Sequence, residues 1–405
     1  MNSKPLNKVK EKIYSLLSET STHIWVLGAG TGKSAKLPLM SELTTLAPKH
    51  LSDKQENYYS KILDILKKNS NVEDLLSFLI DIKQLIQRKR KEEYELVTND
   101  QEKDSIVLSK SEIDSLHEGI RNSIKKIINS GIIRNDGELK LPSNGKTVVD
   151  CSTHEDFIKT LWKFRGGLEE RRKPVPFFTL NYDPTLENAL SMQGVSYIDG
   201  FIGSRTAYWG PEEFGGGDGY VRPFKRLSRN LQAKIYKLHG SIDWCFNEER
   251  IMRKGSELNL NKPSLIYPDS SKFELFKREP FSTMFDSFRN CLSADSEKLL
   301  VSIGYSWGDE HVNKEVMRAF ENQNNNLTLL LFVKELPNTE ENDIGLPRFV
   351  EKLLETSQTV SDNSVLVTTN NGFYRNGLER KHEFENKEDI WKFQGIVDLI
   401  KVGAR

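Results

Sequence analysis

The sequence predicts an α/β fold: a parallel sheet covered by helices on both faces and interrupted by a helical insertion. Short apolar runs rich in strand-forming residues recur along the chain, and several end directly in a glycine or polar loop. Between them, apolar residues follow helical spacing. One run, Leu327–Val333, is apolar throughout, which is typical of a strand buried on both faces of a parallel sheet.

Composition narrows the class of protein. The 405 residues suffice for a core domain with further regions, and 58 basic residues balance 58 acidic ones. This balance argues against general attraction to nucleic acid. The three cysteines, Cys151, Cys245 and Cys291, are far apart and predict free thiols rather than a disulfide framework or a zinc site. An amphipathic N-terminal pattern and the lack of a long apolar run predict a soluble, cytoplasmic protein without a membrane segment.

The first core element follows a helix predicted over Lys8–Leu17. The apolar run Ile24–Leu27 leads into Gly28, Gly30 and Gly32. A strand that ends in closely spaced glycines and then enters a helix is typical of nucleotide-binding folds. Without side chains, the backbone N–H groups can approach a phosphate, and the helix that follows would turn its positive end toward it.

Two other interpretations of this loop remain. Gly32, Lys33 and Ser34 match the end of an ATP-binding P-loop, but its first glycine would fall on Leu27, so an ATPase ranks second. A G-x-G-x-x-G motif fails as well, because its third glycine would fall on Lys33. An ordinary glycine turn is the remaining alternative.

Residues 51–169 predict a helical insertion between the first and second core strands. Apolar residues at helical spacing mark helices around Ile62–Leu66, Leu75–Ile86 and Ile113–Ile133, the last ending at Ser130-Gly131, with a further helix over Phe157–Leu168. The charged run Gln87–Glu95 predicts a solvated helical face or loop, and Asn135–Lys146 a turn-rich excursion or hairpin. The apolar stripes would pack against copies of the insertion or fold onto the core.

Three later strands are each followed by a candidate functional loop. Val175–Leu180 precedes Asn181-Tyr182-Asp183, Lys234–Leu238 precedes His239-Gly240-Ser241, and Lys298–Ile303 precedes Gly304-Tyr305-Ser306. Strands are also expected over Val195–Ile202 and Val365–Thr369, a helix over Asp309–Phe320, and an irregular segment over Tyr208–Arg222 that forms a mobile lid or a surface loop. We therefore expect a core of residues 1–50 and 170–335, with an extension of residues 336–405 packed on it.

Together with the first glycine loop, four such loops follow apolar strands. The carboxyl ends of parallel strands meet at one edge of a sheet, where ligands bind. We therefore expect the four loops to converge on one crevice.

In this order, LGAGTGKSAKLP, TLNYD, KLHGSID and IGYSWGD resemble the G-A-G, T-x-N-x-D, H-G-S and G-x-S motifs of sirtuins. The resemblance covers roughly residues 20–45 and 175–335. It implies a Rossmann-like NAD site and cleavage of the bond between nicotinamide and ribose. The residues that it implies for NAD binding are Gly28, Ala29, Gly30, Thr31, Asn181, Asp183, His239, Gly304 and Ser306.

The resemblance also implies three catalytic residues. Asn181 would hold the nicotinamide ribose or the attacking water, Asp183 would contact the carboxamide end of the nicotinamide pocket, and His239 would be the general base. These types suit the chemistry, because polar groups stabilise an oxocarbenium-like sugar and histidine accepts a proton near neutral pH. Asn181 and Asp183 could instead cap the helix after Pro184, and Ser306 and Asp309 the helix over Asp309–Phe320.

The sequence also departs from the protein-deacetylating members of that family. It lacks their two cysteine pairs, and Leu39-Met40-Ser41 replaces their D-F-R. These departures resemble the bacterial anti-phage branch, whose members hydrolyse NAD to nicotinamide and ADP-ribose. A protein of this size with a helical insertion resembles the partner of a HerA-type hexameric ATPase, and we expect a homo-oligomer with no metal. The alternatives are an NAD-dependent protein deacylase and a sensor that binds NAD or ADP-ribose without cleaving it.

Overall fold

The structure of the protein is a computed structural model. It describes the following parts of the 405-residue chain: residues 4–20, 22–67, 70–89, 92–99, 104–135, 137–143, 145–165, 173–204, 206–214, 232–247, 250–254, 264–266, 279–337, 344–360, 362–384 and 389–403. Within these ranges, each helix is too short or too polar to cross a lipid bilayer.

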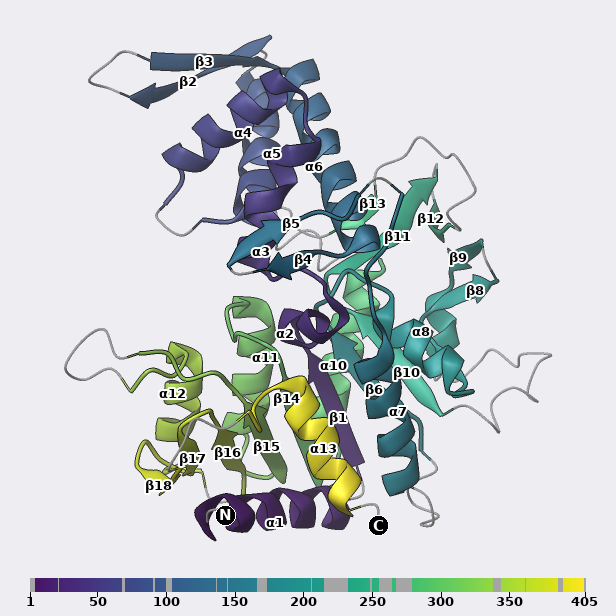
Figure 1. Ribbon diagram of the computed structural model, residues 1–405, viewed down its shortest axis with the longest axis vertical. Helices are drawn as coiled ribbons and strands as arrows, with labels where there is room; N and C mark the ends of the chain where they lie inside the picture. Colours follow the sequence, from purple (N-terminus) through teal and green to yellow (C-terminus); the bar gives the residue numbers. More distant parts are fainter. Residues whose placement is uncertain are drawn as a thin grey trace.

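A nine-stranded sheet forms the centre of the molecule, in the order β18-β17-β16-β15-β14-β1-β6-β10-β7 (Figure 1). All neighbours from β16 to β7 pair in parallel, whereas β17 and β18 add an antiparallel edge. The predicted Rossmann-like parallel sheet is therefore confirmed. The strands are β1 (Thr22–Leu27), β6 (Val175–Thr179), β7 (Tyr197–Ile198), β10 (Ala233–Lys237), β14 (Lys298–Ile303), β15 (Leu327–Phe332), β16 (Ser364–Thr368), β17 (Gly372–Arg375) and β18 (Arg380–Glu383).

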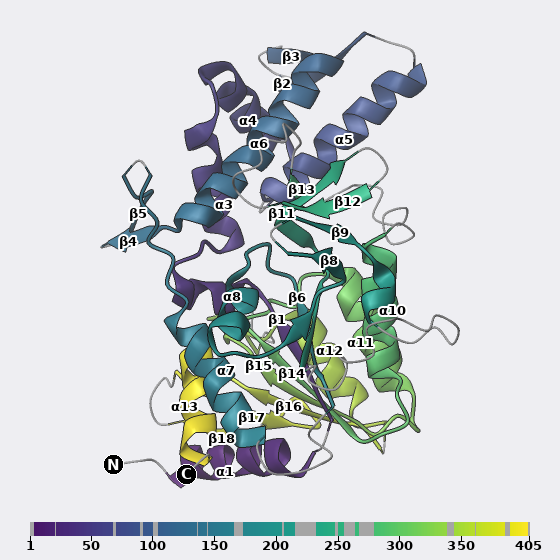
Figure 2. The same ribbon diagram turned by 90° about the vertical axis from the view of Figure 1, so that its right-hand side faces the viewer.

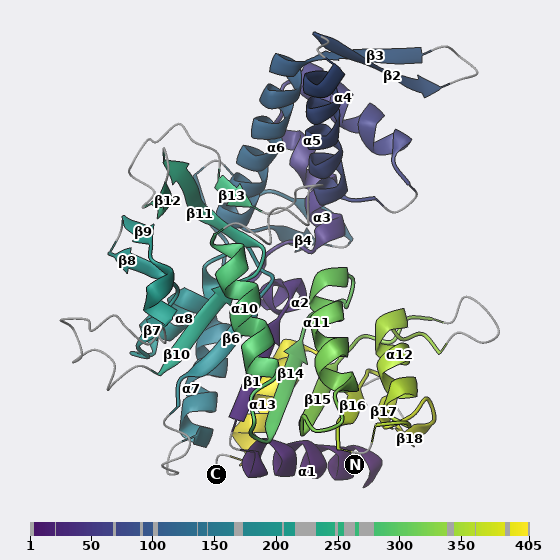
Figure 3. The same cartoon turned by 180° about the vertical axis from the view of Figure 1, so that it is seen from behind.

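Helices cover both faces of this sheet, as the unbroken apolar strands predict. On one face lie α10 (Phe281–Leu292), α11 (Glu310–Glu321) and α12 (Arg348–Thr356), which Figure 3 shows in front of the strands. On the other lie α1 (Lys4–Glu19), α7 (Ser152–Arg165), α8 (Thr185–Met192) and α13 (Phe393–Gly403). Side chains of β1 alternate between the two cores: Ile24 and Val26 pack on the first face, Trp25 and Leu27 on the second.

A group of helices lies beyond the carboxyl ends of the central strands (Figure 2). It contains α3 (Met40–Leu46), η2 (Ala47–His50), α4 (Asp53–Ile65), α5 (Val72–Lys89) and α6 (Lys110–Ser130), with a hydrophobic cluster of its own. Ser52 and Ser109 cap α4 and α6 in capping boxes with Gln55 and Glu112. The predicted end of α6 at Ser130 is confirmed, because Gly131 leaves the helix at φ +72°.

Two local predictions in this region need correction. The charged run Gln87–Glu95 is not one solvated element, because α5 ends at Lys89 and a hairpin begins at Glu93, formed by β2 (Glu93–Asn99) and β3 (Asp104–Ser109). The second hairpin, β4 (Ile133–Asn135) with β5 (Glu138–Lys140), starts before Asn135. α7 packs on the central sheet rather than on the helices α3–α6. The predicted domain boundaries stay predictions.

A second sheet of five strands stands beside the helical group, in the order β13-β11-β12-β9-β8. The strand predicted over Val195–Ile202 is instead divided between the two sheets, because Gly200 turns the chain at φ +84°. Trp209 and Phe214 of the expected lid pack together with ring centroids 5.8 Å apart, and residues 215–222 of that segment lie outside the described residues. The strands are β8 (Phe201–Gly203), β9 (Ala207–Trp209), β11 (Gly240–Asn247), β12 (Arg250–Arg253) and β13 (Ser264–Ile266).

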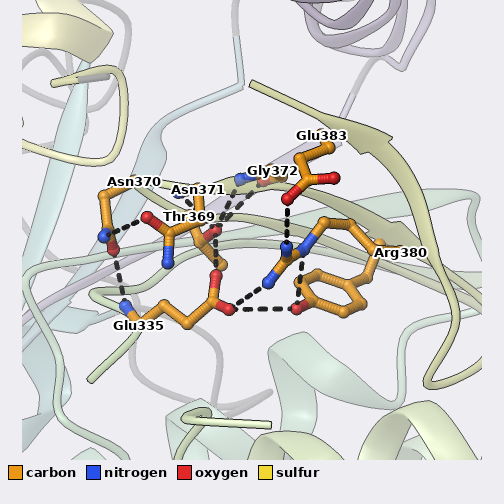
Figure 4. A network of polar contacts seen from close by, with 8 residues as sticks. Glu335, Thr369, Asn370, Asn371, Gly372, Arg380 and Glu383 are labelled. Carbon is orange, nitrogen blue, oxygen red and sulfur yellow. Dashed lines mark hydrogen bonds and ion pairs between the residues drawn. The ribbon is translucent and has the colours of Figure 1, made fainter. Parts of the chain in front are cut away.

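A buried polar network ties the antiparallel edge to the end of β15 (Figure 4). The Glu335 carboxylate accepts hydrogen bonds from Thr369 (2.8 Å) and Tyr374 (3.3 Å) and pairs with Arg380. The Glu335 N–H donates to the Asn370 side chain at 2.8 Å. Because its side chain is held in this way, Glu335 fixes the segment that follows β15. Val333, Lys334 and Leu336 of that segment line the cavity described next.

Candidate active site

The candidate site lies at the carboxyl ends of β1 and β14, where the strand order reverses. From β1 the chain continues to β6 on one side, whereas β14 and β15 extend the sheet on the other. Open α/β sheets bind ligands at such a point. The two loops are joined by their backbones: the Gly28 N–H donates to Ile303 O at 3.0 Å and the Gly30 N–H to Gly304 O at 2.8 Å.

Three glycines, Gly28, Gly30 and Gly304, allow this backbone contact, and we call them the glycine wall. A Cβ on Gly28 would lie 2.5 Å from Gly304 O, and one on Gly30 would lie 2.6 Å from the Gly304 Cα. Gly304 itself has φ +64°, and its Cβ would lie 2.5 Å from the Thr31 N. Any side chain at these positions would force the two loops apart.

Directly after these glycines the chain forms only short turns. α2 (Ala29–Gly32) has 4 residues, continues as the 3-10 turn η1 (Lys33–Ala35), and ends at Lys36 with φ 60°. The next helix, α3, begins only at Met40. The residues LMSELTTLA after Pro38 predict this later helix, and the prediction is confirmed. The wall therefore offers glycine backbone to a ligand rather than the end of a long helix.

One cavity of about 650 Å³ brings the four predicted loops together. Its lining includes the following predicted site residues: Gly28, Ala29, Gly30, Asn181, Asp183, His239, Gly304 and Ser306. Thr31 differs, because it is fully buried and lies within the wall rather than on its surface. The expected convergence of the four loops is therefore found, while the chemical roles of these residues stay predictions.

Thr31 links the glycine wall to Asn181. Its hydroxyl donates to Gly28 O at 2.8 Å and accepts from the Asn181 Nδ2 at 3.1 Å. The Asn181 Oδ1 is buried and has no hydrogen-bond partner among the described residues. A buried amide oxygen left unpaired is costly, so this atom suits a hydroxyl group or water supplied by a ligand.

Asp183 is the cap that one interpretation of the sequence expects. Its Oδ1 accepts from the Thr185 N–H at 3.0 Å and from the Thr185 hydroxyl, at the start of α8. Beneath it, the buried Lys237 Nζ donates to Asp183 O and lies 3.0 Å from the Glu187 Oε1. Burial lowers the pKa of Lys237, but the carboxylates around it outweigh this effect and raise that pKa. The loop that carries Asn181 is therefore anchored by a charged lysine.

His239 pairs with a carboxylate that the sequence assigned only to capping. Its Nε2 lies 3.0 Å from the Asp309 Oδ2, with both side chains almost buried. The Asp309 Oδ1 accepts from the N–H groups of His311 and Val312 at 2.8 and 2.9 Å, which caps α11 as expected. Burial raises the pKa of Asp309, but His239 and these two N–H groups hold it well below its usual range. Asp309 follows the G-x-S loop by three residues, and this position was the signal by which the partner of His239 could have been found in the sequence.

Residues from the helical group close the far end of the cavity. Met40 of α3 and Asn71, Glu73 and Asp74 at the start of α5 line it, and Glu73 accepts a hydrogen bond from the Tyr182 hydroxyl. No sequence motif points to these residues, because they are more than 100 positions from Tyr182. Among the described residues, no group of three or more histidine, cysteine or acidic side chains could hold a metal ion.

Comparisons with known proteins fit this geometry. The family model of a SIR2-like domain matches residues 175–360. The search of curated proteins gave no match. Among solved structures, a Sir2 homologue in complex with NAD is 11% identical, covers 98% of this chain and 93% of its own, and has a TM-score of 0.40. A mutant Sir2 homologue in complex with ADP-ribose is 12% identical, covers 86% and 96%, and has a TM-score of 0.33. The part of the chain that is similar to a SIR2-like domain therefore carries Asn181, His239 and Gly304.

Proposed function

We propose that this protein hydrolyses NAD to nicotinamide and ADP-ribose. One observation carries the proposal: the glycine wall, Asn181 and His239 line the same cavity of about 650 Å³ at the switch point of the sheet. The glycines hold the β1 and β14 loops together at this cavity, and the unpaired Asn181 Oδ1 can accept a hydrogen bond from a ribose hydroxyl or a water. The SIR2-like domain supports NAD as the dinucleotide.

The reaction needs little from the protein beyond positioning and proton transfer. The bond between ribose C1′ and the nicotinamide nitrogen breaks, and its electron pair neutralises the pyridinium. Water then bonds to C1′ and loses a proton to His239. Asn181 orients that water or the ribose, and the polar groups around it stabilise the positive sugar of the transition state. Asp183 would contact the nicotinamide carboxamide through the side of its carboxylate that does not cap α8.

The proposal includes a setting for this reaction. Depletion of NAD would serve anti-phage defence, and pairing with a HerA-type hexameric ATPase, with assembly into a homo-oligomer, would control it. The support for this setting is the motif resemblance and the absence of two cysteine pairs from the sequence. Some control is required, because unrestrained NAD hydrolysis would harm the cell that makes the protein.

The test is release of nicotinamide and ADP-ribose from NAD by the purified protein, alone and with the ATPase. We expect turnover without any acylated peptide, and losses of about 10³-fold or more in His239→Ala and Asn181→Ala. His382→Ala, on β18 and outside the cavity lining, is the matched control and should retain activity. NAD consumption only with an acylated peptide would indicate a deacylase, and binding without cleavage under every condition would indicate a sensor. Unchanged turnover in both active-site variants would refute the site.

A further inference from the structure

We propose that Asp309 is a positioning residue that fixes the His239 ring with its proton on Nε2. This inference rests on the proposed NAD hydrolysis, for which His239 is the base. The Asp309 Oδ2 lies 3.0 Å from the His239 Nε2, and His239 and Asp309 both line the cavity. An ionised carboxylate can only accept hydrogen bonds, so the nitrogen that faces it must carry a proton. The neutral ring then has its lone pair on Nδ1, which becomes the proton acceptor.

The Asp309 carboxylate is itself held in place. Its second oxygen accepts from two N–H groups at the start of α11, so rotation away from His239 would also break the helix cap. The preceding loop is braced by Asn313, whose Nδ2 donates to Trp307 O at 2.8 Å and whose Oδ1 accepts from the Tyr305 hydroxyl at 3.0 Å. Because this loop begins at Gly304, it joins the glycine wall directly to the group that orients the base.

A helix cap alone does not explain this arrangement. One side-chain oxygen is enough for a cap, and serine, asparagine and aspartate cap almost equally well. Asp309 uses its other oxygen for His239, and the side chain of Asp309 is only 12% exposed. A buried carboxylate is costly unless it is paired, and its charge would stabilise the imidazolium that forms when His239 takes the proton of water.

Two substitutions separate the cap from the histidine contact. Asp309→Ser keeps the cap and removes the partner of Nε2. Asp309→Asn keeps the cap through its oxygen and turns an NH₂ donor toward Nε2, which forces the proton onto Nδ1. We expect both variants to lower kcat for nicotinamide release by about 10²- to 10⁴-fold, while affinity for ADP-ribose stays within about twofold of wild type. Asp150→Asn is the matched control, because Asp150 accepts from the Ser152 N–H before α7 and lies outside the cavity lining.

A second measurement does not depend on turnover. Nitrogen NMR of ¹⁵N-histidine-labelled protein, with the signal assigned by His239→Ala, reports which ring nitrogen carries the proton. We expect Nε2 in wild type and Nδ1 in Asp309→Asn, with unfolding temperatures that stay within a few degrees. Wild-type kcat in both Asp309 variants, or a wild-type ring protonated only on Nδ1, would overturn the proposal. If wild-type protein releases no nicotinamide, the proposed function fails, and the NMR result still decides whether Asp309 sets the proton position.

Discussion

The two walls of the cavity are built in opposite ways. The glycine wall packs backbone against backbone, and its residues must be glycines because a side chain would not fit between the two loops. The facing wall, which we call the polar wall, consists of Asn181, His239 and Asp309, whose side chains have buried hydrogen-bond partners. This difference teaches that bare backbone carries the shape of the site and side chains carry its chemistry, even where Gly304 and Asp309 share one loop. Substitutions in the glycine wall should therefore change binding, and substitutions in the polar wall should change turnover.

Among the tests of this difference between the walls, the largest expected effect comes from filling the glycine wall. Gly30→Ala would place a Cβ 2.6 Å from backbone atoms of Gly304, so the loops must separate. We expect affinity for ADP-ribose, measured by calorimetry, to fall by about 100-fold, together with a loss of about 1–3 kcal/mol in stability. Gly308 also lines the cavity, but a Cβ there would lie 3.5 Å from its nearest atom, so Gly308→Ala is the matched variant and should lose far less affinity. Equal affinity in both variants would break the distinction between the walls.

The next effect is a pH dependence of stability that comes from His154, a buried histidine of α7. Burial lowers the pKa of His154 to about 4 from its usual 6.5, against the opposing charge of Asp183. The unfolded state therefore binds more protons between these values, so stability is complete above pH 6.5 and is lost as the pH falls toward 4. Once the pH is below both pKa values, this shift has lowered the free energy of unfolding by about 3 kcal/mol. Denaturant unfolding from pH 8 to pH 4 measures it.

The matched variant for that measurement is His154→Leu, which should reduce the pH dependence by about half. His117 contributes in the same direction, because burial lowers its pKa to about 4 as well. An identical slope in wild type and variant would show that His154 is not buried in its neutral form.

Thr31 offers a way to cut the link between the two walls. Thr31→Val keeps the shape but removes the hydroxyl that joins Gly28 O to the Asn181 Nδ2. We expect kcat to fall by about 10- to 30-fold with little change in ADP-ribose affinity, since Asn181 loses its orientation and the wall stays intact. Thr31→Ser restores the hydroxyl and should recover most of the loss. A fall in affinity alone would place Thr31 with the glycine wall.

The smallest effect concerns the contact between the polar wall's loop and α5. Glu73→Leu and Tyr182→Phe each remove the hydrogen bond between these two side chains, which should cost about 1–2 kcal/mol in chemical unfolding. The double variant should cost no more than either single variant, because both remove the same bond. Fully additive losses would mean that the two side chains act independently.

Much of the fold and of the cavity was predictable, for a local reason. Strands such as Lys298–Ile303 and their loops are written in consecutive residues, so the strand ends and the four loops could be placed. The partners of those residues could not. Asp309 lies 70 positions from His239, and only the folded chain brings its second oxygen to the ring. The hairpin after α5 was missed as well, because charged residues on a protruding hairpin follow no burial pattern.

The most direct test of this division of labour is a solved complex of the His239→Ala variant with intact NAD. The account predicts the diphosphate against Gly28, Gly30 and Gly304, and the nicotinamide ribose within hydrogen-bond distance of the Asn181 Oδ1. NAD bound outside the cavity, or in it with the nicotinamide ribose remote from Asn181, would contradict the account.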